Sequence, residues 1–196
     1  MRIYLVRHAT HSLLGRILCG RAIDVGLDAE GVWQARALGE WFANERVDVL
    51  QASPQRRARE TAQEMGVTIE CLRELVPALD EHDAGEWAGR DFEALARDEQ
   101  WRAWNERRGS VRPPRGESMH ELQGRVIDHI EETRAQRTEA AIMVSHAEPI
   151  RAAIMHYRGI ALDDFQRVQV EPASIHTLHL NAGSVDVHSI SLMATA

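Results

Sequence analysis

The sequence of 196 residues contains no lysine, so all 23 of its basic residues are arginines. This absence excludes a P-loop lysine, a Schiff-base lysine and a lysine general base. A bound anion would have to be held by arginine, histidine or backbone N–H groups. Arginine suits that task because its planar guanidinium can donate two parallel hydrogen bonds to one anion.

Cysteines and long apolar runs are scarce too. The two cysteines, Cys19 and Cys71, lack the spacing of a metal site and cannot form a disulfide framework, so we expect reduced thiols. No stretch approaches the roughly 18 apolar residues of a membrane span. The chain enters a strand pattern within a few residues, which leaves no room for a signal peptide. We therefore expect a cytoplasmic protein that binds no membrane.

Positive charge is not in excess, since the formal net charge is −7. Proteins that bind duplex nucleic acid usually present a basic face, so nucleic acid is not an expected partner. The 44% hydrophobic and 27% charged residues are typical of a soluble globular domain. Without a linker or repeat, residues 1–196 are expected to form a single domain, and the sequence leaves a homodimer open.

Strand patterns alternate with helical patterns along the chain. Apolar runs predict strands at residues 1–6, 47–53, 68–72 and 140–146, followed by a hairpin over 173–192 that turns at 181–183. Helical spacing predicts helices over 28–45, 53–65, 91–107, 117–137 and 149–158. This alternation predicts the α/β class: a three-layer α/β/α sandwich whose largely parallel sheet has an antiparallel edge.

Local signals predict some boundaries of these helices. Asp28 is a plausible N-cap for the first helix, in which Trp33, Ala37, Leu38 and Trp41 follow helical spacing. Ser53 and Pro54 suit the N-cap and first turn of the second helix. Residues 109–116 contain two glycines and two prolines, so a loop is expected there.

Chemically useful side chains follow the predicted strands. Arg7 and His8 come after the first strand, Arg57 after the second and His146 after the later one, while Glu81 lies in a loop with two glycines. Ligands of open α/β sheets bind at the carboxyl ends of the strands, where we expect these groups to meet. Arginines can clamp a phosphoryl group, a neutral imidazole can attack phosphorus, and a carboxyl group can protonate the leaving oxygen.

Some of these assignments have alternatives. His8 alone would be an ordinary loop histidine. Asp83 and Glu86 share the loop of Glu81, and either would suit the role of proton donor. Arg56 and Arg59 fit a solvated helix face.

Five segments together resemble, in order, the blocks of the histidine phosphatase superfamily, the phosphoglycerate-mutase-like family that includes small phosphatases. They are LVRHAT at 5–10, SPQRRARETA at 53–62, DEHDAGEWAG at 80–89, GES at 116–118 and VSHAEPIR at 144–151. The resemblance implies a phosphoglycerate-mutase-like fold and a phosphatase that acts on a small phosphate ester without a metal or organic cofactor.

The resemblance also implies a role for each matched residue. His8 would be the phosphorylated nucleophile, Arg7 and Arg57 the phosphate-binding arginines, His146 the second pocket histidine and Glu81 the proton donor. Two rival functions stay open. A mutase would return the phosphoryl group to a second hydroxyl, but this chain is shorter than typical mutases of the family. A non-catalytic phosphate sensor would be expected to have lost a core residue, and all five positions are filled.

The chain departs from the family pattern near the nucleophile. Ala9 and Ala147 stand where glycine is usual, and Ala88 replaces a glutamate. Leu14 replaces an asparagine, whose lost hydrogen bond Ser12, His11 or Arg16 would have to supply. The candidate substrate-binding residues are Arg7, Arg57, His146, Ala147, Thr10, Ser12 and Arg16.

Two further groups have structural and functional interpretations. His176 and His179 are three residues apart and would face opposite sides of a strand, so they and His188 are expected to pack or to lie at the surface rather than to bind a metal. Arginines 107, 108, 112 and 115 flank the proline loop and would be either a solvated segment or a cationic lid.

Overall fold

In the computed structural model, which describes residues 1–66, 72–136, 138–181 and 184–191, six strands form one sheet in the order β3-β2-β4-β1-β5-β6. The strands are β1 (Arg2–Arg7), β2 (Val49–Ala52), β3 (Leu72–Leu75), β4 (Ala140–Ser145), β5 (Ser174–Leu180) and β6 (Val185–Ser191). The pairs β3/β2, β2/β4 and β4/β1 are parallel, whereas β1/β5 and β5/β6 are antiparallel. This topology confirms the predicted sheet.

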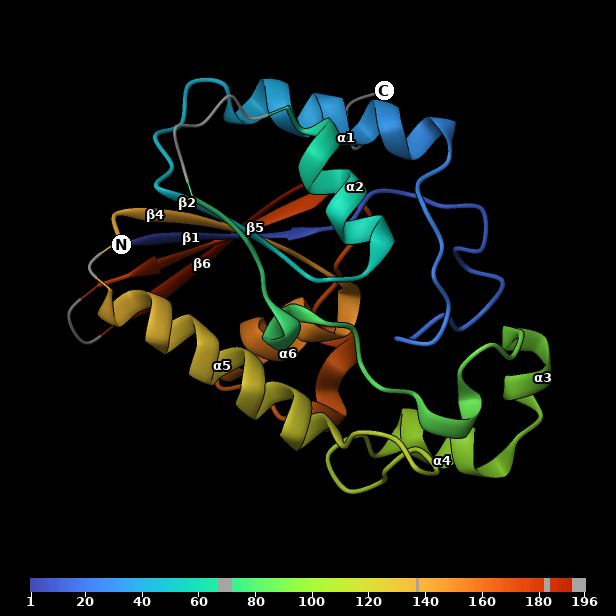
Figure 1. Cartoon of the computed structure of the whole chain (residues 1–196). Helices are drawn as coiled ribbons and strands as arrows, with labels where there is room; N and C mark the ends of the chain where they lie inside the picture. The colour runs from blue at the N-terminus through green and yellow to red at the C-terminus, as the bar shows by residue number, and fades with distance from the viewer. Residues whose placement is uncertain (67–71, 137, 182–183, 192–196) are drawn as a thin grey trace.

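Helices cover both faces of the sheet. They are α1 (Ala29–Phe42), α2 (Arg56–Glu64), α3 (Phe92–Ala96), α4 (Glu99–Glu106), α5 (Met119–Ala135) and α6 (Ala147–Tyr157), with the 3-10 helices η1 (Pro77–Leu79), η2 (Gly85–Trp87) and η3 (Leu162–Arg167). Figure 1 shows α1 and α2 on one side of the sheet and α5 and α6 on the other. The predicted three-layer sandwich is therefore confirmed.

The two central strands, β1 and β4, carry mainly apolar side chains because both of their faces are buried. In β1, Tyr4 and Val6 pack with residues of α1 and α2, whereas Ile3 and Leu5 pack with residues of α5 and α6. A third apolar cluster joins α4 to the start of α5 through Trp104. Helices α3 and α4 lie beyond the carboxyl ends of the strands (Figure 1). None of the helices in the described ranges is long and apolar enough to span a bilayer.

Several predicted boundaries are corrected by the structure. Asp28 does cap α1, but Trp33 is 61% exposed, because the buried stripe of this helix runs through Ala35, Leu38 and Phe42 instead. The predicted helix over 91–107 is two helices, since the Asp98 side chain caps a new start at α4. The predicted strand at 68–72 falls almost entirely outside the described residues, as do Cys71 and part of the hairpin turn.

The starts of α2 and α6 also differ from expectation. Helix α2 begins at Arg56 with Gln55 at the N-cap, so Ser53 does not cap it. Helix α6 begins at Ala147 with His146 at the N-cap, two residues before Pro149. Because neither side chain is used to cap a helix, the side chains of Ser53 and His146 are free to contact each other.

Candidate active site

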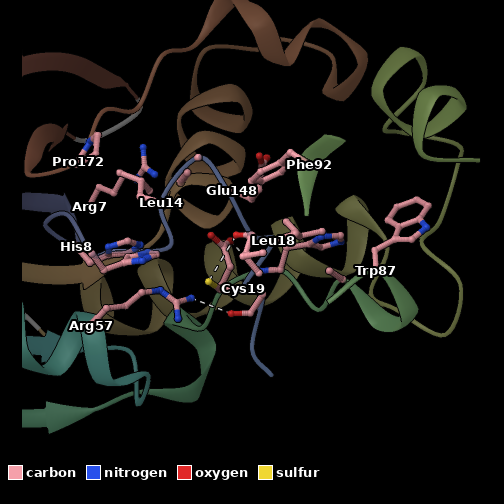
Figure 2. Close-up of a pocket in the computed structure, with 18 of the residues that line it drawn as sticks. Arg7, His8, Leu14, Leu18, Cys19, Arg57, Trp87, Phe92, Glu148 and Pro172 are labelled. Carbon is pink, nitrogen blue, oxygen red and sulfur yellow. Dashed lines mark hydrogen bonds between the residues drawn. The ribbon is translucent and has the colours of Figure 1, made fainter. Parts of the chain in front are cut away.

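A cavity of about 520 Å³ lies where the predicted site residues converge. Its wall contains Arg7 and His8 from the end of β1, Arg57 from α2, Glu81 from the loop after η1, and Ala147 from α6. Figure 2 shows Arg7, His8 and Arg57 together at one end of the cavity and Trp87 at the other. The fold thus brings together residues from across the sequence at one edge of the sheet.

His8 presents one free ring nitrogen. Its backbone N–H donates to Ser145 O at 2.9 Å, which extends the β1/β4 pairing and fixes the start of the loop. Its Nδ1 lies 2.8 Å from Ala9 O. A carbonyl only accepts hydrogen bonds, so Nδ1 carries the hydrogen and Nε2 keeps its lone pair. Burial, together with the charges of Arg57 and Arg7, holds the pKa of His8 well below its usual range. The ring is therefore neutral at physiological pH.

Two arginines flank this imidazole: Arg57 is buried and Arg7 is partly buried. The Arg57 guanidinium donates to Gly20 O at 2.8 Å, and Arg7 donates to Val170 O at 2.6 Å. Arg7 Nε is buried without a hydrogen-bond partner among the described residues. A bound anion at this end of the cavity would satisfy that donor and neutralise both charges.

His146 lies behind His8 rather than on the cavity wall, with ring centroids 5.1 Å apart. Ser53 Oγ donates to Asp80 Oδ1 at 2.6 Å and lies 2.8 Å from His146 Nε2. Since the serine proton goes to the carboxylate, Nε2 of His146 must be the donor to Ser53. Burial, and then the positive charge of Arg57, holds the pKa of His146 well below its usual range. Its Nδ1 is buried and unpartnered among the described atoms.

The loop that carries Glu81 is held by two arginines. Arg21 Nε donates to Glu81 O at 2.7 Å, and Arg125 Nη2 donates to Asp80 O at 2.8 Å. Glu117 forms ion pairs with both arginines, at 2.8 and 2.7 Å. The glutamate of the GES segment therefore acts on the loop through its two arginine partners.

Gly85 allows the same loop to pack closely against residues 113–116. Its φ is +53°, and a Cβ there would lie 2.1 Å from Pro114 O. Any side chain at this position would push the loop away from that segment.

Glu81 is the carboxyl group of this loop that faces the cavity. Burial raises its pKa, and repulsion from Glu148 adds a smaller increase. A carboxyl group that keeps its proton toward neutral pH is suited to general acid catalysis. Asp83 and Glu86 do not line the cavity; Glu86 pairs with exposed Arg115 instead.

The structure places one of the remaining predicted substrate-binding residues on the cavity wall and the others away from it. Ala147 lines the cavity, whereas Thr10, Ser12 and Arg16 do not. Thr10 Oγ1 donates to Asp28 at the start of α1, and Ser12 and Arg16 are exposed. The cavity thus gives no support to a substrate-binding role for these three.

Of the three proposed substitutes for the missing asparagine, His11 lies on the cavity wall. Its ring centroid is 5.4 Å from that of His8, and its Nδ1 is buried without a partner among the described residues. Burial and the nearby Arg57 and Arg7 lower its pKa to about 4. His11 would therefore approach a bound phosphate as a neutral imidazole.

The sequence did not point to Asp80 or to the residues that line the half of the cavity farthest from His8. Asp80 carries no signal, because its contact with Ser53 depends on tertiary packing. Arg108 is neither a solvated residue nor a free cationic lid: it is buried and pairs with Glu148 at 2.8 Å. Arg112 and Arg115 are paired with Glu121 and Glu86. Trp87, Trp101 and Trp104 also line the cavity.

No group of three or more histidine, cysteine or acidic side chains within the described ranges is arranged to hold a metal ion. His176 is buried between Ser174 and Ser189, while the rings of His179 and His188 pack together with centroids 5.4 Å apart. Among the hairpin histidines, His176 is buried, His179 is half-buried and His188 is exposed.

Comparisons with known proteins point to one family of enzymes. The family model of the histidine phosphatase superfamily (branch 1) matches residues 3–192. Phosphoserine phosphatase 1 from Hydrogenobacter thermophilus is 29% identical over 92% of this chain and 87% of its own length. A 2,3-bisphosphoglycerate-dependent phosphoglycerate mutase from Methylobacterium radiotolerans is 34% identical over 89% and 85% of the two chains.

Solved structures share the fold. The α-ribazole phosphatase from Shigella flexneri has a TM-score of 0.85 and 22% identity, covering 96% of this chain and 95% of that chain. A phosphoserine phosphatase from Entamoeba histolytica, in complex with 3-phosphoglyceric acid, has a TM-score of 0.86 and 22% identity, covering 98% of both chains.

Proposed function

Because this chain belongs to the histidine phosphatase superfamily (branch 1), we propose that it hydrolyses a small phosphomonoester through a phosphohistidine on His8. The observation that carries the proposal is the free Nε2 of His8. The hydrogen bond from Nδ1 to Ala9 O leaves that lone pair available, beside the guanidinium groups of Arg7 and Arg57 on the wall of a cavity. A neutral nucleophile between two cations is what attack on a phosphate dianion requires.

In the first step, His8 Nε2 attacks phosphorus in line with the leaving oxygen. The N–P bond forms as the P–O bond to the alcohol breaks, and the Glu81 carboxyl group gives its proton to the departing oxygen. Arg7 and Arg57 hold the phosphoryl oxygens. The negative charge of the bound phosphoryl group opposes the effect of burial and of Arg57 on the pKa of His146, so that its Nδ1 can carry a proton and donate once substrate is bound. Its added charge would be stabilised through Ser53 by Asp80, which lies at the end of the hydrogen-bond chain.

In the second step, water takes the position that the alcohol has left. The Glu81 carboxylate removes a proton from this water, whose oxygen attacks phosphorus as the N–P bond breaks. Inorganic phosphate departs, and His8 and protonated Glu81 are restored. Both steps depend on in-line positioning and on preorganised positive charge, which supply most of the acceleration in phosphoryl transfer.

The 34% identical mutase makes phosphoryl return to a second hydroxyl the main alternative. The two functions separate in one ³¹P NMR experiment with 3-phosphoglycerate and, in parallel, phenyl phosphate, each with and without 2,3-bisphosphoglycerate. A phosphatase releases inorganic phosphate without the bisphosphate, whereas a mutase forms 2-phosphoglycerate when the bisphosphate is present.

Variants tie the activity to the site. His8→Ala should abolish phosphate release, while His156→Ala, on the exposed last turn of α6, serves as the matched histidine control and should retain it. Isomerisation without phosphate release, or native turnover by His8→Ala, would contradict the proposal.

A further inference from the structure

The half of the cavity farthest from His8 differs in chemistry from the phosphate end. Phe92, Trp101 and Trp104 line it together with Trp87, and they pack edge to face or tilted, with neighbouring ring centroids 5.2 to 6.1 Å apart. We call these four residues the aromatic wall. The loop after β1 adds apolar side chains to the same cavity: Leu14, Ile17 and Leu18.

The positive charge in this half of the cavity is already matched. Arg108 donates to Glu148 at 2.8 Å and to Asn105 at 2.9 Å, and its guanidinium stacks 4.0 Å from the Trp104 ring centroid and 3.5 Å from that of Phe165. Burial alone would raise the pKa of Glu148, but attraction to Arg108 and Arg151 lowers it to about 2. Glu148 is therefore an anion across the physiological pH range.

The arginines that line the cavity in the described part of the chain are Arg7, Arg57 and Arg108. The first two lie beside His8, where the phosphoryl group would bind, and the third is paired. In the half of the cavity away from His8, the described lining therefore offers no unpaired arginine to a carboxylate on the leaving group. Such a carboxylate would instead face Glu148 on the cavity wall. Burying an unpaired carboxylate there is unfavourable.

A flat apolar group fits the same surface. Ring faces pack well against tryptophan and phenylalanine edges, and they displace water from the aliphatic side chains opposite. The indole N–H of Trp104 is buried and has no partner among the described residues.

We propose that the leaving group of the substrate is an uncharged alcohol with a flat, largely apolar ring, bound against the aromatic wall, and that carboxylate-bearing phosphate esters are poor substrates. This inference rests on the proposed phosphatase function and specifies its substrate class. It differs from the chemistry named for the phosphoserine phosphatases and for the phosphoglycerate mutase, since phosphoserine and 3-phosphoglycerate both carry a carboxylate.

The test is a set of kcat/KM values for four esters of primary or secondary alkyl alcohols: 2-phenylethyl phosphate, ethyl phosphate, phosphoserine and 3-phosphoglycerate. We expect 2-phenylethyl phosphate to exceed each of the other three by at least about tenfold, the discrimination typical of an apolar pocket. Equal or faster turnover of phosphoserine, 3-phosphoglycerate or ethyl phosphate would overturn the inference. No phosphate release from any ester would overturn the proposed function as well.

A variant and its control test whether the preference for a ring arises at the aromatic wall. Trp101→Ala should reduce kcat/KM for 2-phenylethyl phosphate at least about fivefold more than for ethyl phosphate, because the lost contact involves the ring. Trp33→Ala, the exposed tryptophan of α1, is the matched control and should leave both values unchanged.

Glu148→Gln keeps the shape of the side chain and frees Arg108 from its counter-ion. We expect it to raise the ratio of phosphoserine to ethyl phosphate turnover by about tenfold. Unchanged ratios in both Trp101→Ala and Glu148→Gln would show that the leaving group does not bind in this half of the cavity.

Discussion

Nδ1 of His8 donates a hydrogen bond to the carbonyl oxygen of Ala9 at 2.8 Å, and this contact determines which ring nitrogen faces the chemistry. The acceptor belongs to the next residue in the chain, so the backbone itself fixes the tautomer. Burial and the two flanking arginines act on the same ring and keep it unprotonated. The nucleophile is therefore oriented and neutral before substrate arrives.

The depressed pKa of His8 predicts activity at acidic pH. In the free enzyme, an imidazole that resists protonation stays nucleophilic below pH 6.5, the usual pKa of histidine. We expect kcat/KM for an ester, corrected for the ionisation of its phosphate, to stay level from pH 7 down to at least about pH 5.5. A steady-state pH profile measures this. An acid limb centred near pH 6.5 would show that His8 titrates as an exposed histidine.

Glu81→Gln should affect substrates unequally. The raised pKa of Glu81 makes its carboxyl group an acid toward neutral pH, and a poor leaving group needs that proton most. We expect kcat to fall about 10² to 10⁴-fold for an alkyl phosphate and much less for 4-nitrophenyl phosphate. Asp83→Asn, in the same loop but away from the cavity wall, is the control. Equal losses for both esters would remove the acid role from Glu81.

The same carboxyl group predicts the alkaline limb. As pH rises through the elevated pKa of Glu81, the acid is lost and kcat for alkyl phosphates should decline. Glu81→Gln should remove that limb from the pH profile while lowering the plateau. A limb that persists unchanged in the variant would belong to another group.

Asp80 is expected to act on His146 through Ser53. Ser53→Ala removes the acceptor of the His146 Nε2 hydrogen, and Asp80→Asn removes the charge at the end of the chain. We expect each to lower kcat about 10- to 100-fold, as the loss of an outer-shell partner typically does. ¹⁵N NMR of the His146 ring should show a changed tautomer or pKa. Native kcat and an unaltered ring spectrum in both variants would exclude this positioning role.

Stability should fall as pH decreases from about 6.5 toward 4. Burial lowers the pKa of His176 to about 4, so in this range the unfolded chain binds a proton that the folded chain does not. Each such histidine makes unfolding easier by up to about 1.4 kcal/mol per pH unit. His176→Gln, far from the catalytic cavity, should therefore make this pH dependence shallower, as measured by urea unfolding at several pH values. An identical slope would contradict the prediction.

The sheet was predictable because its signals are local. Runs such as Ile3 to Val6 identify doubly buried strands, and alternation with helices predicts their parallel pairing. The boundaries of α2 and α6 were less accurate, because Ser53 and His146 make tertiary hydrogen bonds in place of the local caps that their residue types suggest. Trp33 was assigned inward by spacing alone, although the buried stripe lies one position away.

The phosphate end of the cavity was more predictable than the leaving-group end. Arg7, His8, Arg57 and Glu81 follow strand ends or sit in recognisable blocks, and all four line the cavity. Glu148 lies in the last of these blocks and Arg108 beside the proline loop, but neither pattern indicates that they pair, since the contact joins residues 40 positions apart. Pairing of this kind depends on how the segment after α4 packs against α6 and is invisible in a single sequence.

A rapid-quench experiment with ³²P-labelled 4-nitrophenyl phosphate tests the phosphohistidine on His8 most directly. With so good a leaving group, the first step should outrun the second, and label should accumulate on the enzyme. The account predicts label that survives base, is lost in acid and maps to the peptide containing His8, with none on His8→Ala. Label on another residue, or full turnover with no labelled enzyme and inversion of configuration at phosphorus, would contradict it.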